Sequence, residues 1–519
     1  MGRGVPEHHN VEMIVYQAWT SMRQFRRALA AVVLFVALGQ VACSSYQDKE
    51  QDRDLRQALV GTWREYLVFK GTPNFTALHR FRLDDNGDPI EVLKYEYGVQ
   101  SRIWSGLKDV SVSGGRIDLY GEFEGSFSAG RDSILLEYPT RDGTTLDFVL
   151  VRSRDDAEHA FMDSLESCRL TPYVYLAPEP TGDGIACGSL EAIGIADAKI
   201  LELMERIRKG HYRDFHSLLV IKNDTLVLEE YFGGRGQVHG PFLTRHAREK
   251  IHQLASCTKS VNSTLIGIAR DKGMIPSLDV SVSTYFPDYP ALGEGTKSTV
   301  TIRDLLTMSA GFEWNELSVS YEDRDNDVNL MWQSHDPLAY LFDKPMEETP
   351  GTVFNYNSSG STALGEILRR ASGMAVDSFA VKELFEPMGI DQFEWTRHLS
   401  GLVSTGGGLS LRSRDLAKIG LLFLHRGQWN GTQIVSEQWI SEATSAKVRT
   451  PSGHYGYQWW IREYATSAKA YTAIGLGGNF LTVFPDRNLI VVATAQDFDN
   501  GWSRRYSTIL EKYILPSFK

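Results

Sequence analysis

A serine and a lysine three residues apart are the first side chains whose types and spacing could support chemistry. Ser256 and Lys259 open a stretch in which Val261, Leu265 and Ile268 recur at helical spacing. This pattern predicts a helix that begins near Ser256 and carries both side chains on one face. A serine hydroxyl becomes a nucleophile when a base takes its proton, and a desolvated lysine can be that base. The pair therefore indicates nucleophilic catalysis, although S-x-x-K alone also fits a helix cap followed by a surface lysine.

Four further segments keep the order and the motifs of a known family. They are TIRDLLTMSAG at 301–311, PGTVFNYNSSG at 350–360, STGGGLS at 404–410 and GYQWW at 456–460. With S-x-x-K they resemble class C β-lactamases and related penicillin-recognising serine hydrolases, from about Tyr173 onward. The most similar subgroup contains 6-aminohexanoate-dimer hydrolases and class C-like esterases. The resemblance implies a β-lactamase/transpeptidase-like fold that cleaves an amide or ester through an acyl-enzyme, with no metal and no cofactor.

The resemblance also implies roles for individual residues. It makes Ser256 the acylated nucleophile, Lys259 its base or proton relay, and Tyr356 a second proton-transfer group. A free tyrosine has a pKa near 10, so we expect Tyr356 to serve only if the nearby lysine charge lowers that pKa. Which of Lys259 and Tyr356 starts deprotonated stays open, because coupled groups need not permit one answer.

Two departures from the family pattern bear on the substrate. Ser358 stands where the family has asparagine, and its hydroxyl can bind substrate or Lys259 but lacks the two ends of an amide. The K-T-G motif is absent, and Ala473-Ile474-Gly475 is its counterpart by register. We assign substrate binding to Ser358, Gly475, Leu476, Gly477 and Gly478. The glycines permit close backbone approach, so one N–H of this strand can complete an oxyanion hole with the N–H of Ser256. The K-T-G motif would supply a cationic side chain that receives the carboxylate of a β-lactam. Its absence favours a simple amide or ester as the substrate.

Two alternatives stay open. The first is a true class C-type β-lactamase or D-Ala peptidase, in which Arg412 or Lys418 supplies the missing cation. The second is a non-catalytic binder of peptidoglycan fragments on the same fold. The Ser256, Lys259 and Tyr356 set argues against the binder.

Other chemistries find less support. The chain has no G-x-S-x-G, so a nucleophile elbow is unsupported. The spacing of His239, His246 and His252 matches no zinc signature, and we interpret them as loop and surface residues. We expect Cys257 to be a packed thiol. Trp459 and Trp460 are expected to form part of the sheet wall and one side of the cleft.

The elements that must position these residues span 189–519. The pattern predicts a helix at Asp197–Ile207, a hairpin at Ser217–Phe232, strands at Asn479–Phe484 and Leu489–Ala495, and a helix at Trp502–Leu515. Strands near both ends with helices between them favour an α+β domain, an antiparallel sheet flanked by helices plus a helical region.

Upstream, residues 59–153 alternate apolar and polar side chains, which predicts a small antiparallel β-barrel or sandwich. Its function is open between holding substrate or cell wall and simple packing. Residues 154–188 are rich in Pro and Gly near their end and predict a linker. Cys168 and Cys187 bracket the Pro- and Gly-rich part and could form a disulfide or remain thiols.

The first 43 residues carry an export pattern. Arg23, Arg26 and Arg27 precede the apolar run 28–38, which is too short to span a bilayer. Cys43 follows and resembles a lipoprotein lipidation site, although Gln40 departs from the pattern. We expect residues 1–43 to be an upstream segment and signal peptide, with the start at Met1 or Met22. Residues 44–58 are expected to be a polar tether, and the protein a membrane-anchored lipoprotein of the bacterial periplasm.

Composition agrees with these predictions. A chain of 519 residues suggests two or three domains, and 42% hydrophobic and 23% charged residues are typical of globular proteins. The net charge of −11 argues against a nucleic-acid partner. The expected partners are a small-molecule amide or ester substrate and, through the lipid anchor, a membrane. The sequence leaves the oligomeric state open.

Overall fold

The computed structural model describes most of the chain between residues 44 and 518. Outside the described residues lie 1–43, 70–71, 84–88, 97–102, 105–107, 114–115, 120–122, 129, 140–144, 155, 157–158, 160–161, 163–172, 196–197, 209–210, 213–214, 236–242, 322, 465–466, 497–500 and 519. The chain forms two compact units, the first mainly up to Tyr173 and the second mainly from Val174 onward.

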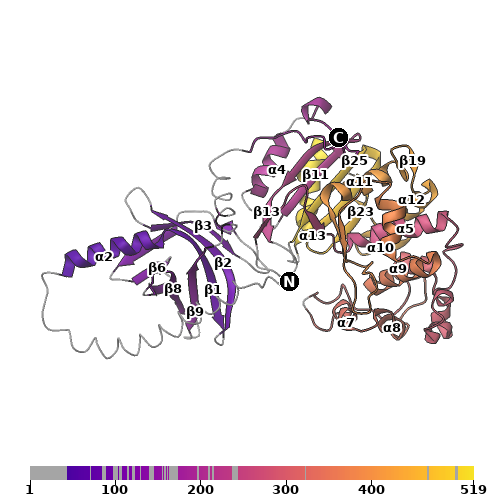
Figure 1. The fold of residues 1–519 in the computed structure, drawn as a ribbon, viewed down its shortest axis with the longest axis horizontal. Coiled ribbons are helices and arrows are strands. Elements are labelled where there is room, and N and C mark those ends of the chain that lie inside the picture. The colour runs from indigo at the N-terminus through magenta and orange to yellow at the C-terminus, as the bar shows by residue number, and fades with distance from the viewer. Residues whose placement is uncertain are drawn as a thin grey trace, which may run out of the picture. The chain divides into compact units, whose positions relative to one another are not determined.

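The first unit is an antiparallel β-barrel preceded by a helix, drawn in indigo and purple in Figure 1. The helix is α2 (Ser44–Leu59), and the strands are β1 (Gly61–Phe69), β2 (Thr72–Leu83), β3 (Pro89–Glu96), β4 (Ile103–Trp104), β5 (Lys108–Ser113), β6 (Arg116–Leu119), β7 (Phe123–Phe127), β8 (Ser133–Pro139) and β9 (Thr145–Arg152). Their order is β2-β1-β9-β8-β7-β6-β5-β3-β4, and β3 also pairs with β2. This second pairing closes the sheet on itself, so of the predicted barrel and sandwich the first unit is the barrel.

The stretch expected to be a polar tether is instead helix α2. Leu55 and Leu59 are buried in one cluster with the barrel residues Trp63, Phe81 and Ile134. The Trp63 indole donates a hydrogen bond to the Leu59 carbonyl at 2.7 Å. The segment has neither Gly nor Pro and is rich in good helix formers. Its two leucines supply a narrow apolar edge, which the mean polarity of the segment concealed.

The second unit is built on a nine-stranded sheet. Its order is β10-β12-β11-β25-β24-β23-β22-β21-β20. The strands are β10 (Ala186–Cys187), β11 (Phe215–Lys222), β12 (Thr225–Tyr231), β20 (Val448–Thr450), β21 (Gly453–Tyr455), β22 (Trp460–Glu463), β23 (Lys469–Gly475), β24 (Asn479–Phe484) and β25 (Leu489–Ala495). β11 and β25 pair antiparallel from Phe215 opposite Ala495 to Lys222 opposite Leu489. The predicted α+β domain, whose sheet joins both ends, is therefore confirmed.

Helices cover both faces of this sheet (Figure 1). They are α4 (Ala198–Arg208), α5 (Cys257–Asp271), α6 (Ile302–Leu306), α7 (Asp327–Gln333), α8 (Pro337–Phe342), α9 (Ser358–Ser372), α10 (Val376–Ala380), α11 (Ser413–Leu424), α12 (Glu437–Ala443), α13 (Trp502–Ile509) and α14 (Leu515–Ser517). Successive side chains of β24 point to opposite faces. Phe480 stacks on Tyr506 of α13, and Leu481 meets Gly420 of α11.

Three small sheets complete the second unit. β13 (Gly233–Arg235) pairs with β14 (Leu243–Arg245), and β18 (Gln428–Trp429) pairs with β19 (Thr432–Gln433). β15 (Ile251–Gln253) and β16 (Phe393–Trp395) both pair with β17 (Leu409–Arg412). β15 leads directly into the turn before α5, so this last sheet positions Ser256.

The end of the predicted linker is part of the second unit. β10 pairs in parallel with β12, so the chain near Cys187 is bound to the catalytic sheet. Cys187 carries a free thiol, and Cys168 lies outside the described residues.

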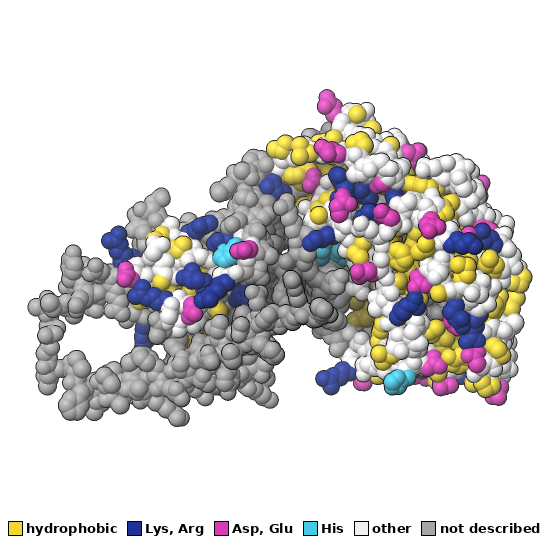
Figure 2. All heavy atoms as spheres, viewed as in Figure 1, with side chains coloured by type: hydrophobic (Ala, Val, Ile, Leu, Met, Phe, Trp, Pro, Cys, Tyr) yellow, Lys and Arg dark blue, Asp and Glu magenta, His cyan; other side chains and the backbone are white. Residues whose placement is uncertain are grey.

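Two surface properties can be stated for the described residues. Within them, no helix is both long and apolar enough to cross a bilayer. Figure 2 shows basic and acidic side chains interspersed over the face of the second unit in view.

Candidate active site

Ser256 lies at the first turn of α5, after a strained residue. Ala255 has φ 46°, a left-handed conformation that residues with a side chain rarely adopt. Ser256 occupies the N-cap position of α5, yet its side chain makes no capping hydrogen bond. Its Oγ instead accepts a hydrogen bond from Lys259 Nζ at 2.8 Å. Ser256 therefore does not cap the helix with its side chain, which is bound by Lys259 instead.

Lys259 is a buried amine that faces three oxygens. Only 1% of the residue is exposed. Its Nζ donates to Ser256 Oγ at 2.8 Å, to Ser358 Oγ at 2.9 Å and to the Gly406 carbonyl. Burial lowers the pKa of Lys259 to about 8, against the opposing charge of Glu316. A substantial neutral fraction of this amine is thus present near neutral and mildly alkaline pH.

Tyr356 closes the other side of Ser256. Its phenol hydrogen-bonds the Ser256 side chain, and Lys259 Nζ lies 4.9 Å from the centre of its ring. Burial and the Glu316 charge raise the pKa of Tyr356 well above its ordinary value. The expectation that this pKa would be lowered is wrong, because burial and the Glu316 charge raise it. A raised pKa favours the protonated phenol, which can donate a proton.

Ser358 bridges the lysine to a carboxylate that the sequence analysis missed. It begins α9, accepts from Lys259 Nζ and donates to Glu316 Oε1 at 2.7 Å. Glu316 is 1% exposed and also accepts from the Ser358 N–H, the Trp314 indole and the Tyr321 hydroxyl. Of the two partners proposed for Ser358, substrate or lysine, the structure shows the lysine. Glu316 lies in an irregular loop, where no periodic pattern signals a buried carboxylate.

The glycine turn 475–478 lies beside the segment that carries Ser256. A Cβ on Gly475 would come within 2.1 Å of the Leu254 carbonyl, so only glycine permits this approach of β23. Cys257 Sγ donates to the Asn479 carbonyl at 3.4 Å, which ties the start of α5 to the far end of the turn. Gly477 and Gly478 have φ of 85° and 95°. Cys257 is fully buried and burial raises its pKa, as expected of a packed thiol.

An aromatic wall stands against Tyr356. Trp460 stacks on its ring with centroids 5.7 Å apart, and Tyr455 and Phe354 pack around the pair. Trp459 points the other way, is fully buried and packs on Phe423. Of the two tryptophans, Trp460 belongs to the site and Trp459 to the core.

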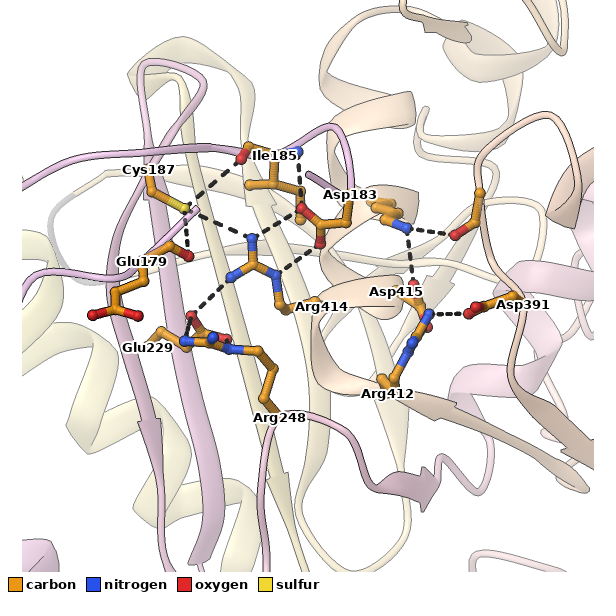
Figure 3. Close-up of polar contacts among 12 residues, drawn as sticks. Glu179, Asp183, Ile185, Cys187, Glu229, Arg248, Asp391, Arg412, Arg414 and Asp415 are labelled. Carbon is orange, nitrogen blue, oxygen red and sulfur yellow. Dashed lines mark hydrogen bonds and ion pairs between the residues drawn. The ribbon is translucent and has the colours of Figure 1, made fainter. Parts of the chain in front are cut away.

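The two cations suggested as substitutes for the missing motif are already paired. Figure 3 shows Arg412 between Asp391 and Asp415, with distances of 2.5 and 2.6 Å. Lys418 is fully buried and contacts Asp415 at 3.1 Å and the Gly389 carbonyl at 2.9 Å. Neither side chain is placed to receive the carboxylate of a β-lactam.

The histidine interpretation needs a correction. His252 is not a surface residue: it is 5% exposed, and its Nε2 lies 2.7 Å from Nδ1 of the buried His216. His246 is half-buried and stacks on His216 with ring centroids 3.6 Å apart, whereas His239 lies outside the described residues. A strand of three residues shows no alternation, so the sequence could not reveal that pairing with β17 turns His252 inward.

The fold and the buried serine–lysine pair define a serine hydrolase of the β-lactamase/transpeptidase type. The Beta-lactamase family model matches residues 215–514, more than half of the chain, and the chain belongs to this family.

Individual relatives agree with this assignment. The 6-aminohexanoate-dimer hydrolase of Paenarthrobacter ureafaciens is 24% identical over 295 residues, which cover 53% of this chain and 71% of that protein. A putative β-lactamase from Bacteroides dorei has a similar fold, with a TM-score of 0.50, 17% identity and coverage of 62% of this chain and 99% of its own. EstCE1, a hydrolase with promiscuous acyltransferase activity, matches with a TM-score of 0.50, 16% identity and coverage of 61% and 97%.

Proposed function

We propose that this protein is an exported serine hydrolase that cleaves a small amide or ester through an acyl-enzyme on Ser256. The observation that carries the proposal is the 2.8 Å hydrogen bond from the buried Lys259 amine to the Ser256 hydroxyl. A lysine with a pKa near 8 can lose its proton to solvent and then accept the serine proton. The proposal of export rests on the basic and apolar segment before Cys43.

In the first half-reaction, neutral Lys259 takes the hydroxyl proton as Ser256 Oγ attacks the substrate carbonyl. The backbone N–H of Ser256 and one N–H of the turn 475–478 stabilise the oxyanion. When the tetrahedral intermediate collapses, protonated Tyr356 gives its proton to the leaving nitrogen or oxygen. The Lys259 ammonium then reprotonates the tyrosine, so no net proton is lost. Water repeats these steps in reverse and releases the acid.

The proposed substrate class follows from β23. A β-lactam carries a carboxylate beside its scissile amide, and Ala473-Ile474-Gly475 offers no charged side chain to meet it. Losing one charge-assisted hydrogen bond costs about 1.5–3 kcal/mol, or roughly ten- to two-hundredfold in kcat/KM. A simple ester loses nothing by this absence. The similarity to a 6-aminohexanoate-dimer hydrolase supports a simple amide as the substrate rather than a β-lactam.

We therefore expect short-chain p-nitrophenyl esters to be hydrolysed at least about tenfold faster, by kcat/KM, than a chromogenic cephalosporin. Both substrates are assayed with wild type and with Ser256→Ala. Cephalosporin turnover that equals the ester rate and disappears in Ser256→Ala would restore the β-lactamase alternative.

The proposal itself is tested by fluorophosphonate labelling followed by intact mass measurement. Wild type should gain one adduct, located on Ser256 by peptide mapping, and Ser256→Ala should gain none. Ser263→Ala is the matched control, because Ser263 is a buried serine of the same helix outside the site and should leave labelling unchanged. An unlabelled wild type that still binds peptidoglycan fragments would favour the non-catalytic binder.

A further inference from the structure

Three histidines from separate segments meet at one place outside the proposed active site. His216 lies on β11, His246 follows β14 and His252 lies on β15. One ring nitrogen from each lies within 4.8 Å of the other two. The nitrogens of a tetrahedral zinc site, at metal distances of about 2.0–2.1 Å, are roughly 3.4 Å apart. The three nitrogens are therefore close enough to surround one metal ion once the rings are oriented toward it.

We propose that His216, His246 and His252 form a binding site for a divalent transition metal of the Zn²⁺ class. Imidazole nitrogens suit Zn²⁺, Ni²⁺ and Cu²⁺, whereas Mg²⁺ and Ca²⁺ prefer oxygen. Three histidines with one open position are a common protein ligand set for zinc. No residue of this site belongs to the Ser256, Lys259 and Tyr356 set.

The hydrogen bonds of His252 prepare it as a ligand. Its Nδ1 lies 2.9 Å from the Gln253 carbonyl, which can only accept, so Nδ1 carries the proton. The lone pair of His252 is consequently on Nε2, which faces His216 Nδ1 at 2.7 Å. A backbone carbonyl that fixes the tautomer in this way is the usual outer contact of a metal-binding histidine. His216 becomes a ligand through Nδ1 when its proton moves to Nε2, and both rings stay neutral.

A polar cavity gives the cluster access to solvent. It has a volume of about 550 Å³ and is lined by His246 and His252. Glu249, Asp391 and Glu394 also line it, against one lysine, Lys250. Asp391 is paired with Arg412, so Glu249 and Glu394 leave a small excess of negative charge over Lys250, which favours entry of a cation. Water or a carboxylate can then occupy the fourth position.

His246 is the ligand that must move. Its ring is nearly parallel to that of His216, with 15° between the planes, so the lone pairs of the two rings do not converge. His246 is half-buried and lies just beyond β14, in a segment without strand pairing. It can therefore turn toward the other two rings without disturbing a sheet. Metal binding should break the His216–His246 stack.

The test uses the full chain without an added histidine tag, freed of metal by chelation. Titration with Co²⁺ should give the visible absorption of a tetrahedral site and saturate at one equivalent, and Zn²⁺ should displace it. His246→Asn should weaken Co²⁺ binding at least about a hundredfold, since loss of outer contacts alone costs ten- to a hundredfold. His335→Asn, which changes an exposed histidine, should bind as wild type.

A thermal melt of each metal-free variant shows that it is folded. If His246→Asn does not fold, His246→Cys replaces it and should retain Co²⁺ with a new thiolate charge-transfer band. Absence of saturable one-to-one binding by wild type would overturn the proposal. The proposal would also be overturned if folded His246→Asn bound Co²⁺ as tightly as wild type. The same holds if folded His246→Cys bound Co²⁺ without the new charge-transfer band.

Discussion

At the scale of single residues, the site is organised around Lys259. The amine is almost completely buried, so water does little to stabilise its charge. The Glu316 carboxylate is linked to the amine by hydrogen bonds through the Ser358 hydroxyl. Desolvation lowers the lysine pKa and raises that of Tyr356, so the two groups are driven toward opposite roles. In the proposed mechanism Lys259 is therefore the base and Tyr356 the acid. This division of roles follows from the burial of the two side chains and not from their residue types.

The first residue-scale prediction concerns pH. The active form of Lys259 is neutral, and neutral amine accumulates as pH rises through its pKa of about 8. We expect kcat/KM for a p-nitrophenyl ester to rise with pH and to level off above about 9. The pKa of Tyr356 is raised, so its deprotonation should impose no fall over the same range. A rate independent of pH between 6 and 9 would contradict Lys259 as the base.

The second residue-scale prediction concerns Glu316. Its negative charge raises the pKa of Lys259, so Glu316→Gln should shift the pH profile to lower pH. The variant also loses part of the carboxylate that holds Ser358, so kcat should fall by about tenfold or more. Glu313→Gln, an exposed carboxylate three residues upstream, is the control and should change neither quantity. A fall in rate with an unchanged profile would show a structural effect only.

At the scale of elements, a buried ion cluster holds the segment around Asp183, which precedes β11, against α11 and β12. Arg414, on α11, contacts Asp183 at 2.8 Å and Glu229 of β12 at 2.8 Å (Figure 3). Arg248 contacts the same glutamate at 3.0 Å. Arg414 and Glu229 are almost completely buried, so each charge depends on the others for its solvation. The cluster therefore fixes the segment around Asp183 on the second unit.

The element-scale prediction tests this cluster. Arg414→Met leaves Asp183 and the buried Glu229 short of a partner, which should lower the free energy of unfolding by about 3 kcal/mol or more. Chemical denaturation measures the change. Arg426→Met breaks an exposed pair with Glu437 and should cost at most about 1 kcal/mol. Equal effects in the two variants would show that the buried cluster contributes no more than a surface pair.

At the scale of the whole molecule, the chain combines a hydrolase unit with a β-barrel that lies outside the matched family region. Residues 1–43 lie outside the described residues. We propose from their sequence that the mature protein is tethered to a bacterial membrane through lipid on Cys43. Lipidation would place the catalytic unit in the cell envelope.

The whole-molecule prediction is that wild type fractionates with membranes and is extracted by detergent. Cys43→Ala should move the protein to the soluble fraction or leave its signal uncleaved, because the lipid attachment point is gone. Cys187→Ala removes a thiol from the second unit and should leave fractionation unchanged. A wild type that is already fully soluble in the periplasm would show that Gln40 prevents lipidation.

Local patterns in the sequence were sufficient for the parts of the protein that depend on neighbours along the chain. Three residues of spacing place Lys259 beside Ser256 on one helix. The two apolar runs at 479–484 and 489–495 predict the two adjacent strands. The sequence also predicted a small antiparallel barrel or sandwich, and the pairing of β2 with β3 makes it a barrel. The family motifs added Tyr356, which now lies against Ser256.

Only the tertiary structure decided features that depend on contacts between distant segments. Glu316 reaches the site through Ser358, 42 residues later, and His216 meets His252 across 36 residues. Neither pairing has a local signature, because each partner is chosen by the packing of whole elements. The assignment of base and acid likewise required the burial of Lys259 and Tyr356. Desolvation depends on everything that surrounds a side chain. The sequence near Ser256 therefore identifies the proposed reacting groups but does not determine their pKa values.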